Sequence, residues 1–130
     1  MRIHVIIAET GAPWDLSLEQ FAAKLAVYRT DALIAVNPDS PGLNAHVSFE
    51  MTLGGQEAEG TYFTGRWQQL ICSETTIEDW APVIEWFLGL LPPASDAQIF
   101  LEAVAIPQDL PRPTTAADIA RILTDLDNSV

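Results

Sequence analysis

Residues 46–60 read HVSFEMTLGGQEAEG, and this stretch decides the class of fold. Apolar and polar side chains alternate over residues 46–53, a period of two that is typical of a strand with one buried face. The apolar positions are Val47, Phe49, Met51 and Leu53. The glycine-rich segment 54–60 then predicts a hairpin loop, with a returning strand over 61–72. An antiparallel hairpin is therefore expected in the middle of the chain.

The segment before this hairpin predicts a strand, a helix and a second strand. Residues 2–8 form an apolar run rich in Ile and Val, as expected in the middle of a sheet. Ser17 is followed three residues later by Gln20, the pattern of a capping box, so we expect a helix over 18–29. A second apolar run over 31–36 ends at a cluster of Asn, Pro, Asp and Gly residues, which predicts a turn.

The segment after the hairpin predicts two helices around one further strand. Thr76 or Asp79 caps a helix that runs to about Leu91, and Asp79 is favoured because Pro82 fits best in the first turn. A strand follows over 98–106, and Thr115 is the expected cap of the last helix. The order is β-α-β-β-β-α-β-α in a single domain spanning 1–130. We therefore expect an α+β fold, with a mixed, mostly antiparallel five-stranded sheet packed with three helices.

Composition excludes several classes of protein. Hydrophobic residues make up 48% of the 130 residues, which is too many for a disordered chain. No stretch reaches the ~20 apolar residues that a membrane-spanning helix needs, so we expect no membrane association and a cytoplasmic location. Cys72 is the single cysteine, which excludes an internal disulfide and fits a reducing compartment.

The charge balance points to a basic partner. The chain has 18 acidic and 6 basic residues, a formal net charge of −12. Such a charge destabilises a small domain by self-repulsion, so we expect that binding a basic protein rewards it. No Lys or Arg occurs between Arg66 and Arg112, where seven acidic residues fall. Nucleic acid is a disfavoured partner because phosphate contacts require Lys and Arg.

The helix expected over 79–91 carries the candidate binding residues. Apolar side chains cover most of its circumference, so it is either buried between layers or half exposed at an interface. If the helix is half exposed, a tryptophan with acidic neighbours is typical of an interface anchor. The predicted partner-binding residues are Glu74, Glu78, Asp79, Glu85 and Trp86. A two-fold contact through the same helix would instead make a homodimer, so a monomer and a homodimer both remain open.

An enzyme is the alternative reading. His46, Ser48 and Glu50 share the polar face of one strand, and the expected neighbouring strand offers Tyr62, Thr64, Arg66 and Gln68. A His, a Glu and an Arg on one face could form a general acid–base site, whereas an ordinary solvated sheet face carries similar pairs. Cys72 would need a lowered pKa to act as a nucleophile. We expect no catalytic residue, no cofactor and no metal, because no phosphate-binding, dinucleotide or zinc pattern is present.

A small, acidic, cysteine-poor α+β domain without an active-site signature resembles bacterial immunity proteins and antitoxins. The resemblance lies in bulk properties over the whole chain and not in a motif. It implies an inhibitor that covers the basic active-site surface of a toxin effector domain. The alternatives are a small enzyme that uses His46, Glu50 and Arg66, and an oligomeric structural module whose acidity serves only solubility.

Overall fold

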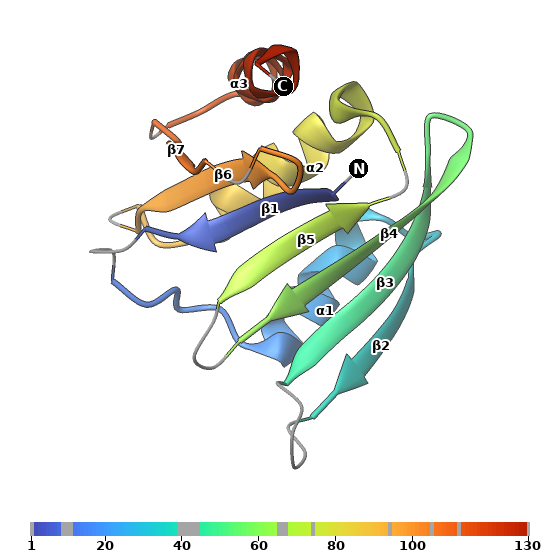
Figure 1. Cartoon of the computed structure of the whole chain (residues 1–130). Helices are drawn as coiled ribbons and strands as arrows, with labels where there is room; N and C mark the ends of the chain where they lie inside the picture. Colours follow the sequence, from blue (N-terminus) through green and yellow to red (C-terminus); the bar gives the residue numbers. More distant parts are fainter. Residues whose placement is uncertain are drawn as a thin grey trace.

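The computed structural model describes residues 2–8, 12–38, 45–64, 68–73, 75–93, 95–104, 106–111 and 113–129. Within these ranges, seven strands form one antiparallel sheet in the order β2-β3-β4-β5-β1-β6-β7 (Figure 1). The strands are β1 (Arg2–Ile7), β2 (Leu33–Asn37), β3 (His46–Leu53), β4 (Gln56–Phe63), β5 (Gln69–Ser73), β6 (Ala97–Leu101) and β7 (Gln108–Asp109). The helices are α1 (Leu18–Tyr28), α2 (Ile77–Gly89) and α3 (Ala116–Asn128).

The helices lie on one side of the sheet. In Figure 1, α1 and α2 lie behind the strands, α3 lies beside the β6 edge, and no helix of the described chain lies in front. α1 packs against β2, β3 and β4, whereas α3 packs against α2 and β6. Alternate strand residues point to the helices and form the core, among them Val5, Phe49, Tyr62, Leu70 and Ile99. No described helix covers the opposite face of the sheet, which we call the open face.

The α+β class is confirmed, but the sheet has seven strands where five were expected. The hairpin turn consists of Gly54 and Gly55 alone, both at positive φ (56° and 79°), so β4 already begins at Gln56. A two-residue turn with two positive φ angles matches the twist of a hairpin. The polar segment 56–60 is therefore strand and not loop. The segment 61–72, expected as one strand, is shared between β4 and β5, and β7 adds a short edge.

Two of the three predicted helix caps are confirmed. Ser17 and Thr115 both form capping boxes, with Gln20 and Asp118 as their respective partners. Of the two candidates for the cap of α2, the favoured one, Asp79, is wrong, because Thr76 is the N-cap and Asp79 lies in the first turn. Pro82 is thus interior to the helix and is exposed, so water can reach the carbonyl that its missing N–H leaves without a helical partner.

α2 is apolar around most of its circumference because it is packed on several sides. Toward the sheet, Trp80 contacts Phe49 at a ring distance of 6.4 Å, and Phe87 contacts Tyr62 at 5.6 Å. Phe87 also contacts Phe21 of α1 at 6.1 Å, and α3 covers a further side. Most of this helix is therefore core, and only a narrow part of its apolar surface reaches solvent.

Candidate functional site

The open face of the sheet brings two carboxylates together. Strand register places Glu50 of β3 directly opposite Glu59 of β4, and Leu33 of β2 on the other side of Glu50. Directly opposite residues of an antiparallel pair share one face, with Cα atoms about 4.5–5.5 Å apart. Both carboxylates therefore stand side by side on the face that no described helix covers.

A shallow hollow of about 430 Å³ surrounds these two residues. Its lining combines two carboxylates, two hydroxyls and an apolar side chain with the backbone of β2, β3 and β4. The residues whose side chains share this face are Leu33, Ala35, Ser48, Glu50, Glu59 and Thr61. Leu33 is 70% exposed. We call this set the carboxylate hollow.

No Lys or Arg of the described ranges forms an ion pair with either carboxylate of the hollow. Three of the four cationic side chains in those ranges pair elsewhere, at nitrogen–oxygen distances of 3.8, 3.1 and 3.3 Å. These pairs are Arg2–Glu102, Arg29–Asp31 and Arg121–Asp118. Like charges directly opposite one another destabilise a sheet. Within the described residues, the negative charge of the hollow therefore has no ion-pair partner.

His46 and Glu50, the two described residues of the predicted acid–base set, lie apart. His46 lies opposite Phe63 at a ring distance of 5.3 Å, and Glu50 follows four residues along β3, about 13 Å away. Tyr62 was expected on this face, and that is wrong: it is fully buried on the helix side and donates to the Leu16 carbonyl at 2.8 Å. Arg66 lies outside the described residues.

Cys72 does not have the surroundings of a nucleophile. It is fully buried on the helix side of β5. Burial raises the pKa of its thiol well above the ordinary value, so the thiol stays protonated at neutral pH. Burial likewise raises the pKa of the Tyr62 hydroxyl.

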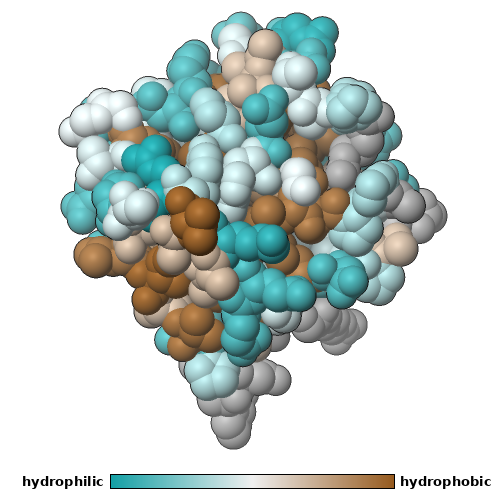
Figure 2. All heavy atoms as spheres, turned by 180° about the vertical axis from the view of Figure 1, so that it is seen from behind, coloured by the Kyte–Doolittle hydropathy of each residue, from teal (hydrophilic) through white to brown (hydrophobic). Residues whose placement is uncertain are grey.

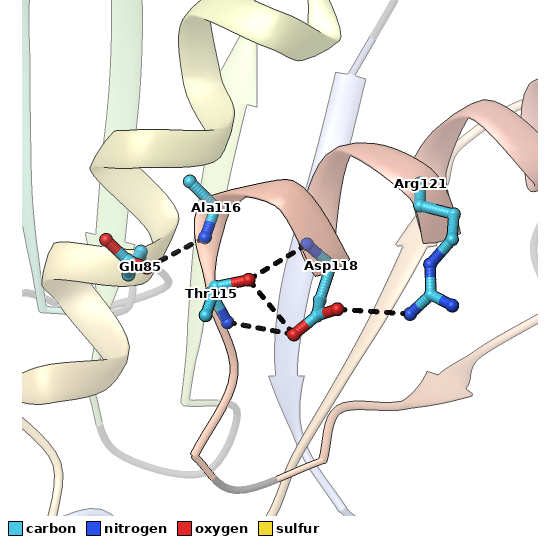
Figure 3. Close-up of polar contacts among 5 residues, drawn as sticks. All are labelled: Glu85, Thr115, Ala116, Asp118 and Arg121. Carbon is cyan, nitrogen blue, oxygen red and sulfur yellow. Dashed lines mark hydrogen bonds and ion pairs between the residues drawn. The ribbon is translucent and has the colours of Figure 1, made fainter.

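Glu85, one of the predicted binding residues, serves the fold. Its Oε2 accepts the backbone N–H of Ala116 at 2.8 Å and so caps the start of α3, next to the Thr115–Asp118 capping box (Figure 3). The free N–H groups of a helix start attract such a carboxylate. An acidic side chain that was predicted to bind a partner thus forms an intramolecular hydrogen bond at the surface.

The other predicted carboxylates have different surroundings. Asp79 Oδ2 accepts the hydroxyls of Thr75 and Thr76 at 3.0 and 2.9 Å, which ties it to the start of α2. Glu78 is exposed and lies seven residues before Glu85, on the same side of the helix. Glu74 lies outside the described residues.

Trp86 lies half-buried at the helix surface. Its ring stacks on Tyr28 at 4.6 Å with an interplanar angle of 7°, and burial of this pair raises the pKa of Tyr28. With Ala23, Lys24, Val27 and Leu90, these two aromatics line an apolar groove of about 470 Å³ between α1 and α2. The groove lies on the opposite side of the sheet from the carboxylate hollow. Trp86 is therefore accessible, although a cation and not an acidic cluster borders it.

Glu59 was missed as a site residue because segment 54–60 was expected to be a loop. Thr61 was missed because its neighbour Tyr62 was expected on the polar face of the strand. The sequence did carry a signal, since Ala58, Gly60 and Tyr62 alternate with Glu57 and Glu59. That alternation places the glutamates on the open face.

Neither the described residues nor comparison with known proteins points to a metal site, a membrane span or a family. The described residues contain no group of three or more His, Cys, Asp or Glu side chains that could hold a metal ion. Within the described ranges, none of the helices has both the length and the apolar character that crossing a membrane requires. No protein-family model, curated protein or solved structure matches the chain.

Proposed function

We propose that this protein is an acidic binding protein that neutralises a basic protein partner. The carboxylate hollow is the proposed receptor for an Arg or Lys side chain of that partner. One observation carries the proposal: Glu50 and Glu59 face each other in a hollow on the open sheet face, without a described counter-charge. A cation between them would relieve a repulsion that the free protein bears.

The hollow suits a guanidinium group in particular. Two carboxylates on neighbouring strands can accept several N–H groups of one planar side chain. The hydroxyls of Ser48 and Thr61 are further acceptors, and exposed Leu33 offers an apolar surface for the methylene stem. An arginine on the partner would thus find charge, hydrogen bonds and packing in one place.

An immunity protein or antitoxin is the class that we favour for this function. Such proteins cover basic surfaces of a toxin, and the bulk properties of the chain resemble theirs. The helix-side surface with Glu78, Glu85 and Trp86 is the alternative contact region, and it lies on the other side of the sheet. A single flat contact cannot cover both, so variants on the two sides distinguish them.

A titration with a basic probe tests the proposal. An amidated tri-arginine peptide is titrated into the protein by calorimetry at about 0.1 M NaCl, where the Debye length is about 10 Å. Glu50→Gln/Glu59→Gln should weaken binding at least about tenfold, because charge-assisted hydrogen bonds are lost. Asp125→Asn/Asp127→Asn on α3 changes the net charge equally and is the matched control, with an expected change below about twofold.

Two outcomes would contradict the assignment. Equal weakening by both double variants would show that the peptide responds only to net charge. Weakening by Glu78→Gln or Trp86→Ala, with Glu50→Gln/Glu59→Gln unaffected, would place the contact on the helix side.

A further inference from the structure

The edge strand β2 lacks, within its own residues, the features that usually protect a sheet edge. β2 is an edge strand whose five residues, Leu-Ile-Ala-Val-Asn, include neither a charged residue nor a proline. Natural proteins protect sheet edges with charges, prolines or very short strands. β7, at the other edge, has two residues and is of the protected kind. Within its five residues β2 has none of these protections, and Leu33 and Val36 are 70% and 43% exposed.

Apolar surface continues from this edge onto the neighbouring helix. Figure 2, which views the molecule from behind, shows apolar surface gathered on the side where α1 and β2 lie. On α1, the helix that packs against β2, Val27 is 83% exposed and also lines the groove beside Trp86. A stable interface buries at least about 1,000 Å² in total, which a five-residue strand pair alone does not supply. A dimer at this edge must therefore also bury apolar surface of the neighbouring helix.

We propose that β2 pairs antiparallel with β2 of a second copy of this chain, around a two-fold axis at Ala35. Directly opposite residues of an antiparallel pair lie on the same face, and a two-fold axis perpendicular to the sheet keeps the same face of both copies on one side. The axis must therefore pass through a residue and not between two. An axis at Ala35 pairs all five residues of the strand. It places Ile34 opposite Val36 of the second copy and Leu33 opposite Asn37 of the second copy.

Charge selects a second copy over a basic partner at this edge. β2 carries no charged residue, although the chain has a net charge of −12. A cationic strand would therefore find no negative charge on β2 to pair with. A neutral, apolar strand fits it, and β2 itself is such a strand. Two copies meet here without opposing carboxylates within the paired strands. The repulsion that remains is long-range, so added salt strengthens the dimer.

Cysteine cross-linking tests the register. In the Ala35→Cys variant the two introduced thiols face each other across Cα atoms about 4.5–5.5 Å apart, within the range of a disulfide. Mild oxidation should therefore give a covalent dimer. Leu33→Cys is the matched control, because the two copies of residue 33 lie about 13 Å apart and should stay uncross-linked. Native Cys72 is fully buried and does not compete.

Sedimentation equilibrium tests the interface. The wild-type chain should form a dimer that tightens with NaCl. Val36→Lys, which buries a charge against Ile34 of the second copy at two symmetric places, should weaken the dimer at least about tenfold. Ile106→Lys makes the same charge change at an apolar residue that is 59% exposed outside β2, and it should leave the dimer intact.

Three results would overturn the proposal. The first is a monomer at every protein and salt concentration, which would leave the edge to an extended segment of another protein. The second is a dimer that Val36→Lys leaves unchanged. The third is cross-linking of Leu33→Cys that is as fast as that of Ala35→Cys.

Discussion

Glu85 accepts the N–H of Ala116 and joins the middle of α2 to the first turn of α3, two helices that share much of the core. Its neighbour on the same exposed side, Glu78, has no such contact in the described chain. The two glutamates belong to one acidic helix surface, yet their contributions to stability should differ. Leaving an N–H group at a helix start without a partner lowers the free energy of unfolding, whereas removing a solvated carboxylate changes it little.

Glu85→Ala should lower the free energy of unfolding by about 0.5–2 kcal/mol, the usual cost of losing a helix cap. Glu78→Ala is the matched control and should change it by less than about 0.5 kcal/mol. Urea denaturation of both variants provides the comparison. Equal effects would show that the contact with Ala116 does not stabilise α3.

The two tryptophans of α2 should respond differently to truncation. Trp80 is fully buried, so Trp80→Ala should cost about 3–5 kcal/mol through the cavity that it leaves. Trp86 is half-buried and stacked on Tyr28, so Trp86→Ala should cost only about 1–2 kcal/mol. Thermal denaturation distinguishes them. A loss with Trp86→Ala as large as with Trp80→Ala would make Trp86 a core residue and remove it as an interface anchor.

At the scale of the element, α3 depends on its capping box. Asp118 accepts the backbone N–H and the hydroxyl of Thr115 at 3.3 and 3.0 Å, and Arg121 lies 3.3 Å away. These contacts, the backbone hydrogen bond first, lower the pKa of Asp118 below the ordinary 3.8. A carboxyl with a lowered folded pKa stabilises the fold above its unfolded pKa. That contribution is lost as the pH falls through the folded value.

Asp118→Asn should therefore lower Tm at neutral pH, and the difference from wild type should narrow as the pH falls below about 4. Melting curves between about pH 2 and pH 7 would show this convergence. Glu19→Gln, in the first turn of α1, is a control of equal charge change. A difference that widens toward low pH would contradict the role assigned to the ionised carboxylate.

At the scale of the whole molecule, the net charge of −12 opposes compactness. The facing pair Glu50–Glu59 is one place where like charges meet, and the three ion pairs among the described residues offset only part of the total. Screening shortens the range of this repulsion. At about 0.1 M salt the Debye length is already near 10 Å, less than the distance across the sheet.

Added NaCl should consequently raise Tm at neutral pH, most steeply over the first ~0.1 M. Mild acidification should be tolerated, because the most crowded carboxylates take up protons first and reduce the net charge. The measurement is a series of melting curves at fixed pH with increasing NaCl. A Tm that falls with NaCl would show that repulsion between the acidic residues does not destabilise the fold.

Local patterns in the sequence were enough for the class of fold. The alternation over 46–53 and the caps Ser17 and Thr115 depend on side chains within a few residues of one another, so the chain reveals them directly. The same reasoning failed at segment 56–60, where a glycine and two glutamates suggested a loop. Residue 60 is a glycine within a strand because the ring of Phe49, opposite it, fills the space that a side chain would occupy.

The sequence by itself determined the kinds of element, the helix starts and the excess of negative charge. Only the tertiary structure decided that β1 lies between β5 and β6, that Tyr62 turns inward, and that Glu50 meets Glu59. It also decided that Glu85 caps α3 and that β2 lies at an edge. The physical reason is range: hydrophobic period and capping act between near neighbours in the chain, whereas strand order and register follow from contacts between residues far apart in sequence.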